Sequence, residues 1–188
     1  METTLTPKPN ATKVATKWAL INAVTAIVIT YIFQFMNIDQ SSSVKYISYI
    51  PFIVFLFLAQ KEFRDELGGY ISFGDAFSAG FRFSLFTGLI LAVFIYLYLA
   101  ILSPDVFAKA LATSEAQMRE KNNMSDEQIA KAMEIAHKWG PIFGAFGAAI
   151  VYAICGAIIS LIGAAIFKKE RSPYDVAQDA IDPTQTEG

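Results

Sequence analysis

The sequence predicts an all-α integral membrane protein, a four-helix bundle that carries a helical hairpin outside the membrane. Of its 188 residues, 54% are hydrophobic and only 17% are charged, whereas soluble domains hold roughly 25% charged residues. The apolar residues also gather into long blocks instead of the short periodic stripes of soluble helices. These observations together favour a bundle of membrane-spanning helices.

Four apolar blocks supply the expected spans, at residues 18–36, 44–60, 76–102 and 141–167. A helix needs roughly 20 residues to cross a hydrocarbon layer that is ~30 Å thick. The second block has the shortest uncharged core, residues 46–59. To cross the membrane, its helix must extend into the headgroups through Lys45 and Gln60. The other three blocks come close to the required length or exceed it.

The first block resembles a signal peptide, because lysines precede it. It is nevertheless too long for the apolar core of a signal peptide. Residues 37–40 after it read NIDQ and contain no small-x-small cleavage pattern. We therefore expect a retained first helix that follows an N-terminal segment, residues 1–17.

Four spans place both termini on one side of the membrane, and the positive-inside rule selects that side. The termini and the loop after the second span hold eight basic residues near the membrane: Lys8, Lys13, Lys17, Lys61, Arg64, Lys168, Lys169 and Arg171. The opposite side holds six: Lys45, Lys109, Arg119, Lys121, Lys131 and Lys138. We expect the inner membrane of a bacterium, with both termini in the cytoplasm.

Residues 103–140 form the one sizeable polar stretch, and its first half predicts a helix. Ser103 is placed to cap a helix whose first residue is Pro104, where the missing N–H costs nothing. Apolar residues then recur at helical spacing until Asn122 and Asn123. They are Val106, Phe107, Ala110, Leu111 and Met118, with Ser114 on the same face.

The second half of this stretch predicts a second helix that pairs with the first. Ser125 and Gln128 have the spacing of a capping box, and acidic residues fill the first turn. Ile129, Ala132, Met133 and Ala136 form its apolar face, and Gly140-Pro141 is expected to stop it. The two helices would form an extracytoplasmic hairpin, the surface best suited to meet another protein.

Two further polar segments complete the chain. Between the second and third spans, Ser72 and Asp75 match a capping box that would fix the start of the third span. The tail, residues 168–188, contains two prolines, several acids and no periodicity. We therefore expect this tail to be disordered in the cytoplasm.

Residues 61–81 carry a resemblance to a known family. The stretch reads Lys61-Glu62-x-Arg64, then Gly69-Tyr70-Ile71-Ser72-Phe73-Gly74-x-Ala76-Phe77-x-x-Gly80-Phe81, and a long helix and a polar arm follow. This succession resembles a family known from Bacteroidota, domain-of-unknown-function family 4199, and the similarity extends over residues 13–170. The resemblance implies a small multi-span inner-membrane protein without an established activity, so it transfers no functional residues.

Arg82 is the one charge inside the apolar core of an expected span, about 9 Å beyond Ala76 along the helix axis. Charges within the membrane often mark function. Because helical side chains lean toward the N-terminus, Arg82 can instead reach the interface and approach Asp75. An interfacial anchor is the favoured interpretation, and a gate or ligand contact is the alternative. Asp75 is likewise interpreted as a helix cap in preference to an ion-binding acid.

Small residues repeat every four positions on the third and fourth expected spans. They are Gly80, Ser84 and Gly88, then Gly140, Gly144 and Ala148, then Gly156, Ser160 and Ala164. This spacing lets two helix backbones approach closely in lipid. We expect the residues to pack helices within one bundle, and homo-oligomerisation through an exposed stripe is the alternative.

The remaining candidates for chemistry have simpler explanations. Glu134 and His137 have the spacing of a helical metal ligand pair, but such sites need two copies and further carboxylates. Cys155 lies in the fourth block, where a thiol is expected to be an inert packing residue. The sequence lacks phosphate-loop, dinucleotide, nucleophile-elbow and zinc-protease motifs. We therefore expect no enzyme activity, cofactor or metal.

The function that these observations favour is that of a scaffold or accessory subunit of an envelope complex, acting through the hairpin. Its partners would be the lipid bilayer and another envelope protein, and a net charge of -2 argues against nucleic acid. A small transporter or channel with Arg82 near its cytoplasmic mouth is the alternative. An enzyme acting on lipids ranks third.

Overall fold

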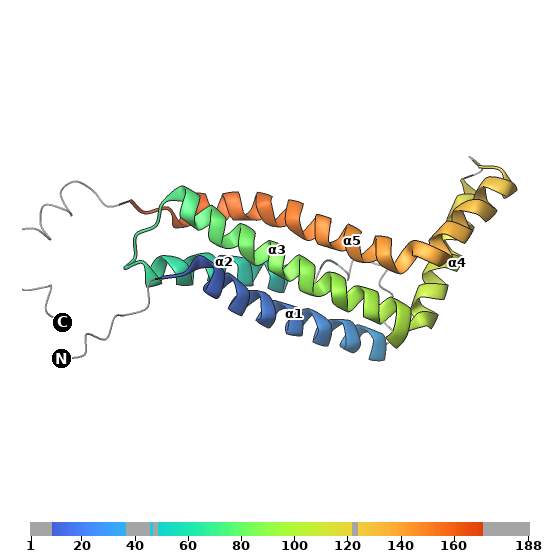
Figure 1. The fold of residues 1–188 in the computed structure, drawn as a ribbon, viewed down its shortest axis with the longest axis horizontal. Coiled ribbons are helices and arrows are strands. Elements are labelled where there is room, and N and C mark those ends of the chain that lie inside the picture. The colour runs from blue at the N-terminus through green and yellow to red at the C-terminus, as the bar shows by residue number, and fades with distance from the viewer. Residues whose placement is uncertain (1–8, 37–45, 47–48, 122–123, 171–188) are drawn as a thin grey trace, which may run out of the picture. The chain divides into compact units, whose positions relative to one another are not determined.

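The computed structural model describes residues 9–36, 46, 49–121 and 124–170. In chain order these residues form α1 (Ala11–Phe35), α2 (Tyr49–Glu66), α3 (Phe73–Leu97), the π-helix η2 (Tyr98–Leu102), α4 (Pro104–Glu120) and α5 (Asp126–Phe167), shown in Figure 1. No strand occurs among the described residues, where Ile71 and Lys169 form an isolated antiparallel bridge. The all-α prediction is confirmed.

Three helical stretches among the described residues are long and apolar enough to cross a membrane: Ala11–Phe35, Phe73–Leu102 and Asp126–Phe167. Such helices are typical of a membrane protein. Helix α2 is not among them, since its 18 residues include the charged run from Lys61 to Glu66. The structure thus describes the second expected span as a shorter apolar stretch that continues into a polar helix end.

The described chain divides into two compact units. The terminal unit comprises residues 1–84 and 155–188, and the central unit comprises residues 85–154. Helices α3 and α5 each contribute residues to both units. The expected N-terminal segment and tail belong to the terminal unit, but residues 1–8 and 171–188 of them lie outside the described residues.

The core of the terminal unit is lined by buried residues at helical spacing. Helix α1 contributes Val14, Ala15, Ala19, Asn22 and Ala23, and α2 contributes Phe52, Leu56, Ala59, Gln60 and Phe63. The first half of α3 and the end of α5 add mostly small residues: Ala76, Ala79, Gly80, Phe83, Ser84, Gly156, Ser160, Gly163 and Ala164. Large apolar side chains on the other faces remain exposed, as lipid contact requires.

Three cross-helix contacts place four helix ends together in the terminal unit. Lys17 near the start of α1 pairs with Glu62 near the end of α2. Gln60 bonds the carbonyl oxygen of Ala76 near the start of α3. Ile71, just before α3, bridges Lys169, just after α5. The start of α1, the end of α2, the start of α3 and the end of α5 therefore share one end of this unit.

A two-glycine turn connects α2 to the short segment that precedes α3. Gly68 and Gly69 adopt φ angles of +79° and +86°, a region that residues with a Cβ rarely occupy. The Gly69 N–H donates to the Arg64 carbonyl oxygen at 2.9 Å, which closes the end of α2 in the manner of a left-handed cap. The paired glycines are therefore explained by the backbone of this turn.

The central unit contains the expected polar helices. Helix α4 begins at Pro104 after Ser103, as predicted, although the Ser103 side chain makes no capping hydrogen bond. The Ser125 capping box is confirmed, because Ser125 N–H donates to Gln128 Oε1 at 2.9 Å and Gln128 N–H donates to Ser125 Oγ at 3.3 Å. Leu111 of α4 and Ile129 of α5 are the most buried apolar residues of the two expected faces.

The expected stop at Gly140-Pro141 is wrong. Helix α5 runs without interruption from Asp126 to Phe167 and contains Pro141 in its interior. Proline removes one helical hydrogen bond and crowds the carbonyl group four residues earlier, which bends or breaks many helices. In Figure 1 the helix changes direction along its length but continues. The second hairpin helix and the fourth expected span are one element.

Candidate functional site

A buried polar junction connects α2, α3 and α5 in the terminal unit. Gln60, fully buried, donates through Nε2 to the carbonyl oxygens of Ala76 at 2.9 Å and Ser160 at 3.0 Å. The Gln60 Oε1 and Ser160 Oγ atoms are buried without a hydrogen-bond partner among the described residues. One amide thus joins three helices, at a position where the sequence predicted a headgroup-facing residue.

Glycines make room for this junction. A Cβ at Gly80 would lie 2.6 Å from Ser160 Oγ and 2.7 Å from Gln60 Nε2, and a Cβ at Gly163 would lie 1.9 Å from Gln60 Oε1. A Cβ at Gly156 would lie 2.0 Å from Ser84 Oγ and 2.2 Å from Ser84 Cβ. Such close approach without a side chain is how helices associate in lipid.

The other small residues of the predicted repeats lie in two different settings. Buried Ser84 donates to the Gly80 carbonyl oxygen at 3.0 Å within α3. In the central unit, Cβ atoms at Gly88 and Gly140 would meet Ala149 O at 3.2 Å and Phe107 Cζ at 2.6 Å. Gly144 is exposed and Ala148 is half-buried.

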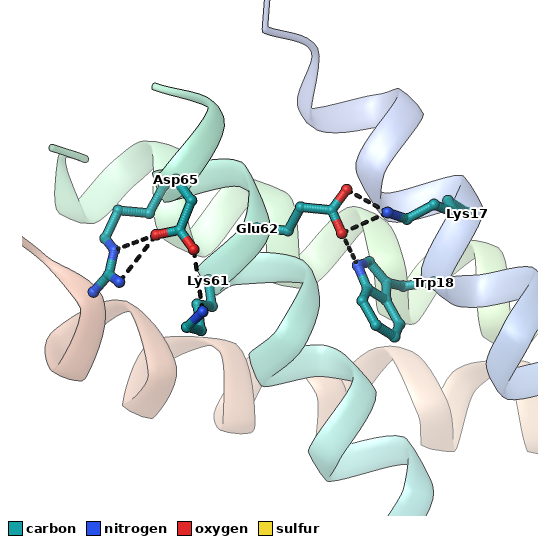
Figure 2. A network of polar contacts seen from close by, with 6 residues as sticks. Lys17, Trp18, Lys61, Glu62 and Asp65 are labelled. Carbon is teal, nitrogen blue, oxygen red and sulfur yellow. Dashed lines mark hydrogen bonds and ion pairs between the residues drawn. The ribbon is translucent and has the colours of Figure 1, made fainter. Parts of the chain in front are cut away.

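A charged cluster next to the junction fastens α1 to α2, as Figure 2 shows. Glu62 accepts hydrogen bonds from Lys17 through both carboxylate oxygens and from Trp18 Nε1 at 2.8 Å. The Trp18 ring also stacks on Phe55, with 5.6 Å between the ring centroids. An amphipathic indole held in this way is typical of the membrane–water interface.

The second part of Figure 2 is the polar end of α2. Asp65 accepts from Lys61 at 3.2 Å and from Arg64 at 3.1 Å, and the Arg64 guanidinium lies 5.6 Å from the centroid of the Phe167 ring. The hydrogen bond from Arg64, followed by that from Lys61, lowers the pKa of Asp65. This carboxylate is therefore ionised at neutral pH, and the helix end carries both signs of charge.

Arg82 does not approach Asp75. Its guanidinium donates to Thr12 Oγ1 at the start of α1, at 2.8 Å. No ion pair between Arg82 and Asp75 is present in the described part of the chain, where Asp75 is bonded to Ser72 instead. The Ser72 hydroxyl accepts from Asp75 N–H at 3.1 Å and donates to Asp75 Oδ2 at 2.6 Å. The predicted cap at the start of α3 is thus confirmed.

An open hollow of about 390 Å³ lies beside this cap. It is lined by Leu67, Tyr70, Ile71, Ser72, Asp75, Lys169 and Glu170. Ile71 N–H donates to the Lys169 carbonyl oxygen at 2.9 Å, and Lys169 N–H donates to the Ile71 carbonyl oxygen at 3.0 Å. The hollow therefore joins the α2–α3 connection to the end of α5.

The polar helices of the central unit carry a second charged surface. Arg119 of α4 bonds Glu115 at 2.9 Å and Asp126 of α5 at 2.8 Å. The hydrogen bond to Glu115, with a further one to Asp126, raises the pKa of Arg119. Glu134 and His137 are both exposed, and no group of three or more His, Cys, Asp or Glu that could hold a metal ion occurs among the described residues.

Gln60 and Gly163 are the structurally decisive residues that the sequence reasoning missed. Gln60 continues the buried α2 series at Phe52, Leu56, Ala59 and Phe63, with intervals of three and four residues. That helical spacing was the signal available in the sequence, since a polar residue on an apolar stripe points into a protein core. Cys155, expected to be buried, is exposed on α5.

The comparisons with known proteins show the family of this chain. No curated protein and no solved structure matches the chain. A family model described as a protein of unknown function (DUF4199) matches residues 17–169. These bounds include Lys17 and Lys169, the residues that fasten the first and last helices of the terminal unit. The chain therefore belongs to the DUF4199 family, as the resemblance of residues 61–81 predicted.

Proposed function

We propose that this protein is a non-enzymatic scaffold or accessory subunit of a bacterial inner-membrane complex. In this proposal it crosses the bilayer four times, with both termini in the cytoplasm. The arm, defined as residues 104–138, lies outside the cytoplasm and binds another envelope protein.

The continuity of α5 is the observation that supports this function best. A single helix of 42 residues contains both the second helix of the arm and a membrane-length apolar stretch. Because α5 is uninterrupted, no loop separates the arm from the apolar stretch. Surface charges such as Lys109, Glu127 and Lys131 are exposed on the arm, and exposed charges favour specific partner choice.

The shared helix ends of the terminal unit support an even number of crossings. Because the start of α1 and the end of α5 lie at one end of that unit, a bilayer around it would leave both termini on the same side. In this proposal α2 provides the return crossing. The basic residues at this end favour the cytoplasm.

The topology is tested with single cysteines in a Cys155→Ala background. Ala112→Cys lies on the arm and Glu66→Cys lies at the shared helix ends, and both positions are exposed. A membrane-impermeant maleimide added to intact spheroplasts should label residue 112 and leave residue 66 unlabelled. Labelling of residue 66 alone would show that the orientation is the reverse of the one proposed and that the arm lies in the cytoplasm.

The scaffold role is tested by photocrosslinking in living cells. Probes at Lys109 and Lys131 should join the same identified protein, and a probe at lipid-exposed Ile158 of α5 serves as the matched control. The same adduct from all three positions would contradict recognition by the arm, as would an arm deletion that leaves the adduct partner fully associated.

Arg82, the basis of the transport alternative, already has Thr12 as its partner.

A further inference from the structure

The open hollow beside the α3 cap has a composition that suits a small zwitterion. Its lining contains one cationic side chain, Lys169, and two carboxylates, Asp75 and Glu170. The remaining walls are provided by Leu67, Tyr70, Ile71 and Ser72. Opposite charges thus border a single space of about 390 Å³.

The charged groups are positioned by the fold. The paired backbone hydrogen bonds with Ile71 hold Lys169, and its ammonium group lies 5.0 Å from the centroid of the Tyr70 ring. Ser72 holds Asp75 through the oxygen Oδ2. No described residue donates a hydrogen bond to Asp75 Oδ1. That oxygen is therefore available to a ligand in the hollow.

The hollow lies where the membrane-length helices end. Helix α3 begins at Phe73, and α5 ends at Phe167, two residues before Lys169. At the ends of spanning helices the surrounding lipid presents its headgroups, and aromatic residues such as Tyr70 are favoured at this level. Half-buried Leu67 offers apolar surface to the adjoining glycerol and upper acyl region, whereas Ile71 is buried and contributes its backbone hydrogen bonds.

We propose that this hollow binds a phosphate ester that carries a primary ammonium group, such as the headgroup of phosphatidylethanolamine. Lys169 pairs with the phosphate, while Asp75 accepts a hydrogen bond from the ammonium group. Glu170, which also pairs with Lys168 at 3.2 Å, offers a second acceptor. An anionic headgroup without a cation would meet the Asp75 carboxylate with no donor for it. A choline headgroup has no N–H donor and prefers several aromatic faces, whereas Tyr70 is the one aromatic residue of this lining.

Binding is measured with the full-length protein in detergent by native mass spectrometry. Phosphatidylethanolamine, phosphatidylcholine and phosphatidylglycerol with identical acyl chains are titrated separately. Loss of a charge-assisted hydrogen bond corresponds to roughly a tenfold change in affinity, so we expect the ethanolamine lipid to bind about tenfold more tightly than the other two. Equal binding of the three lipids would overturn the proposal.

Matched variants identify the site. Lys169→Gln should weaken binding of the ethanolamine lipid roughly tenfold, whereas Lys13→Gln removes the same charge from an exposed position outside the hollow lining and should leave binding unchanged. Asp75→Asn should abolish the preference for ethanolamine over choline, and Asp65→Asn should retain it. Thermal unfolding of every variant is measured alongside. Equal effects of the two lysine variants, at unchanged stability, would reject the site.

Soluble glycerophosphoethanolamine distinguishes the two sources of this chemistry. If the ligand is a membrane lipid, a millimolar excess of the soluble ester should leave lipid binding intact, because the ester lacks the acyl chains. If the ligand is a free ester, it should displace the lipid and bind to the wild-type chain but not to Lys169→Gln. The proposal would be refuted if the lipid and the soluble ester each bound equally well to Lys169→Gln and to the wild-type chain.

Discussion

The buried junction of the terminal unit and the arm of the central unit are both made of helices, but different interactions hold them. At the junction, a Cβ added at any of three glycines would lie within 3 Å of a side-chain atom of Gln60, Ser160 or Ser84. On the arm, the most buried residues are Leu111 and Ile129, and exposed ion pairs join the helix ends. Tight packing specifies the first region, while capping and surface charge specify the second.

The largest expected effect comes from placing a charge in the junction. Gln60→Glu exchanges the donating amide for a carboxylate that faces the carbonyl oxygens of Ala76 and Ser160. A buried, uncompensated charge destabilises by about 3–5 kcal/mol, and protonation in acid removes that charge. The penalty should therefore grow with pH through the ionisation of the new carboxyl group.

The measurement is the midpoint of unfolding by sodium dodecyl sulfate in mixed micelles at several pH values. Gln60→Leu is the control, because it removes the two hydrogen bonds without adding a charge and should cost only about 1 kcal/mol at every pH. A Gln60→Glu variant as stable as Gln60→Leu at high pH would show that the junction admits water.

A methyl group placed on Gly156 should have the next largest effect. The Cβ of Gly156→Ala would overlap with Ser84 Cβ, which is fixed to the α3 backbone and cannot rotate away. Overpacking of this kind costs about 1–3 kcal/mol. The same detergent unfolding should show the loss, and Ser84→Gly in the same chain should restore most of it.

Gly147→Ala provides the matched control on the same helix, because nothing lies within 4 Å of a Cβ at Gly147. Alanine in a helix interior is favoured over glycine by about 0.5–1 kcal/mol, so this variant should be neutral or slightly stabilised. Equal destabilisation at the two positions would mean that glycine content, not helix contact, determines stability.

A smaller and local effect is expected on the arm. Ser125→Ala removes the side-chain partner of Gln128 N–H at the start of α5, which costs about 1 kcal/mol of helix stability. Because no tight packing depends on this cap, hydrogen exchange of the first turn of α5 should accelerate while the detergent midpoint stays unchanged. A shift of the global midpoint would indicate that the arm folds cooperatively with the spans.

The smallest effect is expected from the surface pairs around Asp65. The pKa of Asp65 is lowered by Arg64 and Lys61, so its pairing stabilises the fold above its ordinary value of 3.8 and loses this contribution as pH falls through the folded value. Exposed pairs contribute little. Wild type and Asp65→Asn should differ slightly near neutral pH and coincide in acid, as measured by the same unfolding midpoint.

Local signals in the sequence predicted the parts of this fold that depend on neighbouring residues. The Ser72 and Ser125 caps and the start of α4 at Pro104 were all found, because their determinants lie within four residues. The passage of α5 through Pro141 was not found. Proline stops many helices, and its tolerance here depends on the surroundings of the whole helix.

The junction was missed for the same reason. The role of Gln60 depends on Gly80 and Gly163, which lie far away in the sequence, and the partners of Arg82 depend on where α1 packs. The hollow was also beyond sequence reasoning, since Asp75 and Lys169 meet only after the chain has folded. The resemblance of residues 61–81 nevertheless pointed to a stretch that contains Glu62, Ile71 and Ala76, which bond to other elements of the terminal unit.

The short bridge between Ile71 and Lys169 has a mechanical consequence for α5. A helix turns by about 100° per residue. A bridge next to its last residues therefore fixes how the final segment is rotated about the helix axis. With this angle fixed, α5 keeps Gly156, Ser160 and Gly163 facing the packed surfaces of α2 and α3. Two hydrogen bonds just beyond the end of α5 thus restrict rotation of the helix about its axis and keep the glycine contacts in register.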